Sequence, residues 1–386
     1  RTDAIAATVV IIALLGALVA SVLVLTRPDR QKSSGPAAPR FDSRVEKKLE
    51  ATLDRLMSEG EIPGAIVGVW VPGRGTWVVA RGVSNLENNT PMRVDDRVRI
   101  ASVTKTFVAT VVLQLVDEGK LSLDDTIDRF VTRVPNGNAV TIRQLLNHTS
   151  GLYDFIFDPV FQAACTADPL EKWTPRQLLS SSVLHDPYFA PGAKFHYSNT
   201  NYVLLGMVVE KLTGRSVGTE ISRRILEPLS LRHTTFETTP EMAKPASRGY
   251  SEEYGRLVDI THRDPSMGWA SSGMSSNLDD LRTWSLAFAN GGLISEESER
   301  ERAVLVSEPG SEVKYGAGMM EWGGFVGHEG NAFGFSTAMF HHPSKNATVV
   351  VIFNQSGGRV TATRAFSEFA RLLFGNEVPA KLDNSR

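Results

Sequence analysis

The stretch Ala101-Ser102-Val103-Thr104-Lys105-Thr106-Phe107, followed by the apolar run 108–116, places a hydroxyl and an amine three residues apart at the start of a helix. Residues at this spacing share one helix face, with roughly 5–6 Å between their Cβ atoms. Burial beside apolar residues lowers the pKa of a lysine, and a neutral lysine can activate a serine. Backbone N–H groups at the helix N-terminus also suit a developing oxyanion. We therefore interpret Ser102 as a nucleophile and Lys105 as its base.

A serine followed three residues later by a lysine is a weak pattern by itself. It also occurs at Ser311-Glu312-Val313-Lys314, where polar, glycine-flanked surroundings indicate a solvated surface. Ser102 differs because apolar residues at helical spacing follow it. Without further motifs, a plain N-cap serine would explain Ser102 equally well.

A second motif, Tyr197-Ser198-Asn199, follows Pro191-Gly192 and begins a long apolar helix. A phenol beside a lysine can carry a proton between a nucleophile and a leaving group. An asparagine amide can bind both a substrate carbonyl and the lysine. The alternative is a helix cap with a packed tyrosine.

A third motif, Gly327-His328-Glu329-Gly330, lies at the end of a predicted strand. Glycines in a strand allow another backbone to approach closely, and an imidazole can donate a hydrogen bond or support proton transfer. A lone histidine near a strand end is more often structural. The motif gains weight only together with the other two.

Composition excludes several function classes. The chain has 386 residues with 42% hydrophobic content, enough for one large domain or two medium ones. A net charge of −2 provides no basic stripe for a nucleic-acid partner. The single cysteine, Cys165, excludes an internal disulfide framework and a cysteine-based metal site. Without His-Glu-x-x-His or comparable spacing, a metallohydrolase is disfavoured, and we expect no cofactor and no metal.

The N-terminal region predicts a membrane segment. Residues 4–25 form 22 consecutive positions with no charge and no proline, long enough for a membrane-spanning helix. We favour an anchor over 1–26 rather than a cleaved signal peptide. The flanking charges leave its orientation open. This interpretation places the protein in the cell membrane, single-pass, with an extracytoplasmic catalytic domain.

The remaining chain predicts one α+β domain. A Pro, Ser and Gly-rich linker spans 27–40, the domain spans 41–376, and 377–386 form a tail. The domain pattern is an amphipathic helix, strands, a helical insert at about 119–242, strands and a closing helix. Two hairpin strands at 64–71 and 76–82 precede the insert, and further strands follow at 315–322, 324–329, 336–342 and 348–353. An antiparallel sheet flanked by helices, with an inserted all-helical region, is the simplest architecture.

The order Ser-x-x-Lys, Tyr-Ser-Asn and His-x-Gly resembles the penicillin-recognising serine hydrolases, which include class C β-lactamases and serine D-alanyl-D-alanine carboxypeptidases. The resemblance covers about 45–374 and extends to Leu145-Leu146-Asn147-His148-Thr149-Ser150-Gly151-Leu152. It implies a β-lactamase/transpeptidase-like fold and attack by Ser102 on a carbonyl, with proton exchange through Lys105 and Tyr197. It also implies that the backbone N–H groups of Ser102 and Asn331 bind the oxyanion. The other implied site residues are Asn199, His328, Glu329 and Gly330.

The resemblance implies an acyl-enzyme and, as the main interpretation, a D-alanyl-D-alanine carboxypeptidase acting on peptidoglycan stem peptides, with β-lactams as candidate covalent ligands. Two positions depart from that branch. Met320 stands at the usual arginine position, and Glu329 replaces a threonine. An acid there should repel a substrate carboxylate. An esterase, amidase or D-aminopeptidase on the same scaffold is therefore the alternative, and a non-catalytic penicillin-binding protein is a further one.

Overall fold

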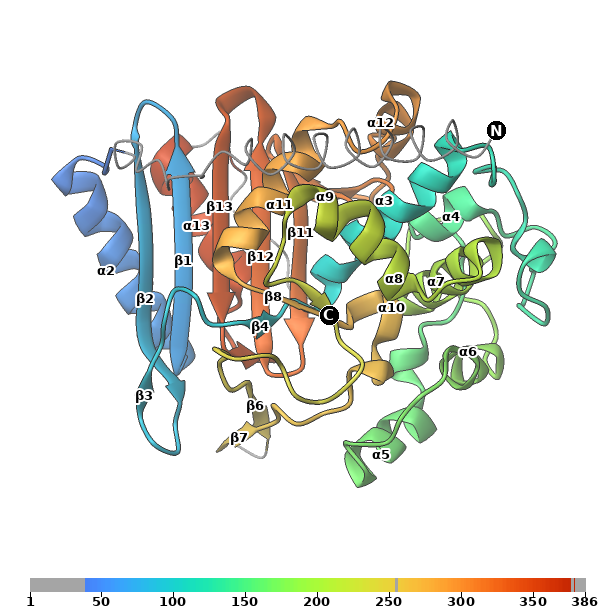
Figure 1. Cartoon of the computed structure of the whole chain (residues 1–386), viewed down its shortest axis with the longest axis horizontal. Coiled ribbons are helices and arrows are strands. Elements are labelled where there is room, and N and C mark those ends of the chain that lie inside the picture. Colours follow the sequence, from blue (N-terminus) through green and yellow to red (C-terminus); the bar gives the residue numbers. More distant parts are fainter. Residues whose placement is uncertain (1–38, 254–255, 376–377, 379–386) are drawn as a thin grey trace, which may run out of the picture. The chain divides into compact units, whose positions relative to one another are not determined.

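The computed structural model describes residues 39–253, 256–375 and 378. Its largest element is an eight-stranded antiparallel sheet in the order β3-β2-β1-β13-β12-β11-β10-β9 (Figure 1). The strands are β1 Gly64–Val71, β2 Gly75–Asn85, β3 Thr90–Pro91, β9 Lys314–Tyr315, β10 Met320–Trp322, β11 Phe325–Ala332, β12 Phe335–His342 and β13 Ala347–Phe353. The predicted α+β fold with an antiparallel sheet and flanking helices is confirmed.

Helices cover both faces of the sheet because the central strands are apolar on both sides. In β13, Val349 and Val351 pack with the cluster that contains α2 (Ser43–Gly60) and α13 (Ala362–Phe374). Between them, Val350 points to the opposite cluster, which contains α3 (Thr104–Asp117) and α11 (Leu278–Asn290). Figure 1 shows α11 in front of the sheet and α13 behind it. The alternation follows from the period of two along a strand.

The remaining helices lie beside the sheet, next to α3 (Figure 1). They include α4 Ile142–Leu146, α5 Pro159–Ala167, α6 Pro175–Val183, α7 Asn199–Thr213, α8 Val217–Ile221, α9 Glu227–Leu229, α10 Trp269–Ser272 and α12 Glu296–Arg302. The described residues also form two small three-stranded sheets, with the strand orders β14-β6-β7 and β4-β8-β5. Their strands are β4 Val98–Arg99, β5 Thr235–Phe236, β6 Tyr250–Glu253, β7 Arg256–Asp259, β8 Met274–Ser276 and β14 Gln355–Ser356. The short strand β5 interrupts the insert that was predicted to be all-helical.

The membrane prediction is corrected. Among residues 39–253, 256–375 and 378, no helix is long and apolar enough to cross a bilayer. The helix α2 has 18 residues but carries charged side chains, and the apolar α3 has only 14 residues. The predicted anchor (1–26), nearly all of the linker (27–40) and all of the tail except Val378 lie outside the described residues. The prediction of a single-pass membrane protein with an extracytoplasmic domain is not retained.

Candidate active site

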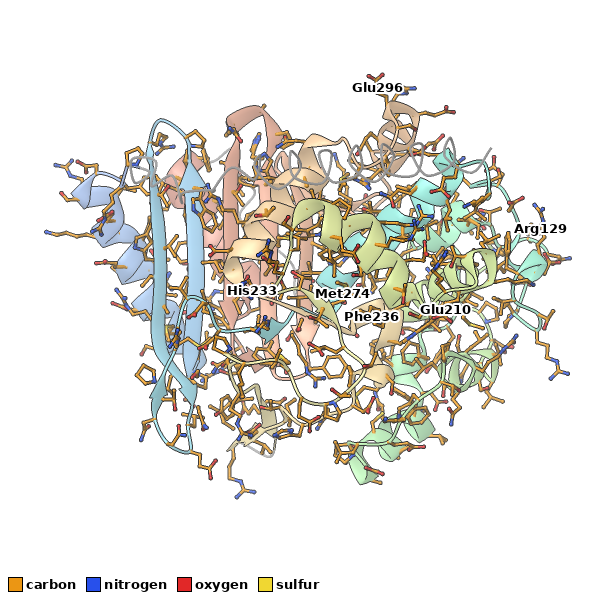
Figure 2. The ribbon with its side chains drawn as sticks, in the orientation of Figure 1. Arg129, Glu210, His233, Phe236, Met274 and Glu296 are labelled. Carbon is orange, nitrogen blue, oxygen red and sulfur yellow. The ribbon has the colours of Figure 1, made fainter. Side chains whose placement is uncertain are left out.

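The first turn before α3 holds Ser102 in a constrained position. Ala101, which precedes it, has a φ of 45°, a left-handed conformation that is uncommon for residues other than glycine and is frequent at functional sites. The backbone is fixed there because the N–H of Ile100 donates to the carbonyl of Met274 at 3.0 Å. Figure 2 labels Met274 near the centre of the view. Ser102 is half-buried, whereas its neighbours Ala101 and Val103 are buried.

Lys105 lies one helical turn after Ser102 and is fully buried. Its ammonium nitrogen is 3.0 Å from Ser102 Oγ, 2.8 Å from Asn199 Oδ1 and 2.9 Å from the carbonyl oxygen of Ser271. Burial lowers the pKa of Lys105 to about 7, and the nearby Asp154 carboxyl opposes this shift. A substantial fraction of Lys105 is therefore neutral near pH 7 and can accept a proton from Ser102.

Tyr197 lies beside the same two groups. Its ring centroid is 4.9 Å from Lys105 Nζ, and burial raises its pKa well above the ordinary value, although a hydrogen bond with Ser102 opposes the shift. The phenol is therefore protonated in the resting state. It can return a proton to a leaving group while Lys105 takes one from Ser102.

His148, to which the sequence analysis gave no role, fixes the backbone next to Tyr197. The two rings stack with centroids 4.2 Å apart. His148 Nδ1 accepts hydrogen bonds from the N–H of Ser198 at 3.1 Å and from Asn201 Nδ2 at 3.2 Å. Burial lowers its pKa well below the ordinary value, so the ring stays neutral. Its location in the segment 145–152 was the only sequence signal.

Asn199 connects Lys105 to a carboxyl that no sequence motif indicated. Its amide oxygen accepts from Lys105, and its Nδ2 donates to Asp154 Oδ2 at 2.9 Å. Asp154 is buried, and burial raises its pKa, while hydrogen bonds from Asn199 and Ile156 oppose the shift. The predicted position of Asn199 beside the lysine is thus observed, and its role toward substrate stays a prediction.

His328 lies in β11 and is buried against two aromatic rings. Its Nδ1 donates to the carbonyl of Glu329 at 2.5 Å, and its Nε2 accepts from the Tyr315 hydroxyl at 2.8 Å. Its ring centroid is 6.3 Å from that of Tyr197. Burial lowers the pKa of His328 to about 3. The ring is therefore neutral at physiological pH and supplies no positive charge to the site.

Gly330 brings the β11 backbone against the nucleophile. A Cβ at this position would lie 2.3 Å from the carbonyl oxygen of Ile100 and 3.0 Å from the backbone nitrogen of Ser102. On this side of β11, β10 pairs only with residues 325–327, so 328–332 present an open strand edge near Ser102. Asn331 is exposed and its Oδ1 accepts from the N–H of Gly357 at 3.1 Å. The assignment of the Asn331 N–H to an oxyanion hole stays a prediction.

Replacing Gly330 with alanine should test this close approach. The clash is with backbone atoms, so we expect a loss of about 1–3 kcal/mol in the free energy of unfolding and slower acylation of Ser102. Gly218→Ala in α8 is the control, because the atoms nearest to the added Cβ belong to the Phe236 side chain, at 3.1 Å, and not to the backbone, and alanine favours a helix. Denaturant unfolding and labelling rates check both. An unchanged Gly330→Ala protein would contradict the close approach.

Glu329 lies on the face of β11 opposite to His328. Its carboxyl accepts a hydrogen bond from Thr363 of α13 and is half-buried. Burial raises its pKa. Met320 is buried in the cluster on the same face. The carboxyl of Glu329 thus points toward α13, opposite to His328 because residues alternate along the strand, and its role in substrate binding stays a prediction.

The comparisons with known proteins agree with this geometry. The beta-lactamase family model matches residues 49–370. The chain belongs to the beta-lactamase family. Members of this family share the fold described above, so the predicted resemblance is confirmed, as is the predicted enzyme class of serine hydrolase.

Individual relatives come from several organisms. A D-aminopeptidase from Brucella anthropi is 28% identical over 327 residues, which are 83% of this chain and 61% of that protein. Protein flp from Staphylococcus aureus strain MW2 is 26% identical over 326 residues, 82% of this chain and 64% of that protein. The chain thus spans less than two thirds of the length of these curated relatives.

Two solved structures have similar folds. A D-stereospecific amidohydrolase from Streptomyces sp. has 33% identity and a TM-score of 0.76, covering 86% of this chain and 98% of that one. A D-amino acid amidase from Ochrobactrum anthropi SV3, complexed with L-phenylalanine amide, has 25% identity and a TM-score of 0.75, covering 86% and 99%. Both are similar to this beta-lactamase family member over almost the whole described domain.

Proposed function

We propose that this beta-lactamase family member is a serine amidase or aminopeptidase that hydrolyses amides of D-amino acids through an acyl-enzyme at Ser102. The charge balance of the site carries this proposal. The Asp154 carboxyl lies in the site, linked to Lys105 through the Asn199 side chain, while burial keeps His148 and His328 neutral. Such surroundings favour a substrate with an amine over one with a free carboxylate.

The names of the relatives support the same proposal. The proteins described above are a D-aminopeptidase, a D-stereospecific amidohydrolase and a D-amino acid amidase. The substrate of each is a property of that protein. Their agreement favours the alternative from the sequence over a D-alanyl-D-alanine carboxypeptidase.

The proposed reaction has two stages. Ser102 Oγ attacks the amide carbon while its proton passes to neutral Lys105, and the backbone N–H groups of Ser102 and Asn331 bind the resulting oxyanion. The C–N bond then breaks, and the leaving nitrogen receives a proton through Tyr197. In the second stage, water attacks the ester carbon, and Lys105 and Tyr197 accept its proton as the general base. The bond between Ser102 Oγ and the acyl carbon then breaks and Oγ recovers its proton, so the products are the free amino acid and the amine or ammonia released in the first stage.

A carboxypeptidase acting on stem peptides is the second candidate, because the open edge of β11 at 328–332 can pair with a peptide backbone. The electrostatics oppose it. Two unit charges of like sign about 8 Å apart at an effective dielectric near 20 repel by about 2 kcal/mol, roughly thirtyfold in affinity.

A substrate panel tests the proposal. Steady-state kinetics would compare D-phenylalanine amide, L-phenylalanine amide, a D-Ala-D-Ala peptide, a short-chain ester and a chromogenic cephalosporin. We expect the highest kcat/KM for the D-amide. The repulsion above should make the kcat/KM of the D-Ala-D-Ala peptide at least about thirtyfold lower. A matched peptide with an amidated C-terminus is the control, because it removes only the carboxylate charge. Equal or better turnover of the free-carboxylate peptide would refute the proposal.

A further inference from the structure

Asp154 is the carboxyl linked to Lys105 through the Asn199 side chain. It is 1% exposed and precedes the 3-10 turn Phe155–Phe157. Its Oδ1 accepts from the N–H of Ile156 at 3.3 Å, and its Oδ2 accepts from Asn199 Nδ2 at 2.9 Å. Both oxygens therefore act as hydrogen-bond acceptors. This arrangement suits an ionised carboxylate, because a protonated one would have to donate.

A single amide group links Asp154 to the base. Asn199 presents its oxygen to Lys105 Nζ at 2.8 Å and its nitrogen to Asp154 at 2.9 Å. The opposite amide orientation would place NH₂ against the lysine and the amide oxygen against the carboxylate. Both contacts would then be unfavourable, so Asp154 and Lys105 together determine which way the amide points.

We propose that Asp154 is a positioning residue for acylation: it orients the Asn199 amide, and its negative charge holds the proton on Lys105, so that it sets the pH above which Ser102 becomes a nucleophile. The proposal rests on Lys105 acting as the base, as in the proposed function. It does not depend on which substrate the enzyme uses.

The neighbouring titratable groups determine the sign of the expected pH effect. They are His148, His328, Tyr188, Tyr197, Tyr202 and Glu329. Burial keeps the two histidines neutral and the three tyrosines protonated near neutral pH, and it raises the pKa of Glu329. Burial also lowers the pKa of Lys105, and the charge of Asp154 opposes it. Without that charge the pKa falls further, so neutral Lys105 would persist to lower pH.

The experiment measures the second-order rate of Ser102 labelling by a neutral fluorophosphonate between pH 4 and 9. Asp154→Asn retains an acceptor for Asn199 but removes the charge. We expect its acid limb to shift to lower pH by about one unit or more, with a similar plateau rate. Asp154→Ala removes both the acceptor for Asn199 and the charge. We therefore expect the same shift of the acid limb together with a plateau rate that is at least about tenfold lower. Asp154→Glu, which keeps the charge, should restore the limb toward its wild-type position.

Asp280→Asn is the matched control. Asp280 is also buried, but it accepts from the N–H of His233 and the hydroxyl of Thr234, so the limb should not move. If Asp154→Asn does not fold, Asp154→Ser removes the charge and keeps a residue that can cap the following turn. An unchanged limb in a folded neutral variant, or a shift to higher pH, would overturn the proposal. Failure to hydrolyse D-amino acid amides would refute the proposed function alone, because the fluorophosphonate carries no amino acid.

Discussion

Ser102→Ala is expected to abolish covalent labelling and turnover while the protein stays folded. The hydroxyl lies 3.0 Å from Lys105 Nζ at a half-exposed position, and no other group described in the site could form the same acyl-enzyme. The N-cap residue of α3, Val103, makes no side-chain hydrogen bond to the helix. Removing the Ser102 hydroxyl should therefore cost no more stability than a lost cap does, about 0.5–2 kcal/mol. Mass spectrometry after treatment with a fluorophosphonate or a fluorescent penicillin would detect the adduct.

Ser311→Ala is the matched control because Ser311 occupies the other Ser-x-x-Lys sequence. Ser311 is exposed and donates to the carbonyl of Val313 at 2.9 Å, while Lys314 is exposed in β9. The variant should label and turn over as the wild type does. An adduct on Ser311, or full activity of Ser102→Ala, would reject the assignment of the nucleophile. A folded wild type that takes no label would favour the non-catalytic alternative.

The sequence predicted the elements whose signals are local. The helix α2 buries Leu49, Leu53 and Leu56 at helical spacing, and β1 is a continuous apolar run. The predicted strand at 315–322 was wrong in detail, because it is divided into β9 and β10. Gly318, with a φ of 69°, turns the chain between them, and a Cβ there would lie 2.3 Å from the Cβ of Ala109. Periodicity alone does not show such a tertiary approach.

The residues of the candidate site likewise fall into those that the local sequence predicted and those that only the fold brings together. Ser102 and Lys105 are paired by helix geometry, and their spacing alone predicted that they would be close. Asp154 and His148 act through contacts with a segment about 45–50 residues later in the chain. Asp154 gives no periodic or motif signal, and His148 gives only its place in the segment 145–152, so these contacts became visible only in the fold. The contact of Glu329 with Thr363 of α13 was likewise not predictable, because the motif gave the position of Glu329 in the strand without the face to which it points.

Lys105→Met and Tyr197→Phe should each slow acylation by about 10²–10⁴-fold, the usual contribution of general acid–base catalysis. Methionine is close in size to lysine, so the buried space stays filled, and phenylalanine retains the stack on His148, whose centroid is 4.2 Å away. Thermal unfolding would verify that both variants fold. Pre-steady-state labelling or the burst phase of turnover would give the acylation rates.

The pH dependence separates the two roles. Because burial lowers the pKa of Lys105 to about 7 and the base must be neutral, acylation by the wild type should rise with pH through about 7 and then level. Tyr197→Phe should keep this limb at a lower rate, because the pKa of Tyr197 is raised well above its ordinary value and the phenol does not titrate there. Lys105→Met should lose the limb, because burial lowers the pKa values of His148 and His328 and keeps both rings neutral in that range.

The double variant decides whether both residues serve one proton path. Lys105 Nζ lies 4.9 Å from the Tyr197 ring centroid, and both groups hydrogen-bond with Ser102. Groups that act as a unit give strongly non-additive losses, so Lys105→Met with Tyr197→Phe should be little slower than the slower single variant. If the two losses multiplied instead, each residue would stabilise the transition state independently. The proton would then leave Ser102 through Lys105 and reach the leaving nitrogen by a route that does not include Tyr197.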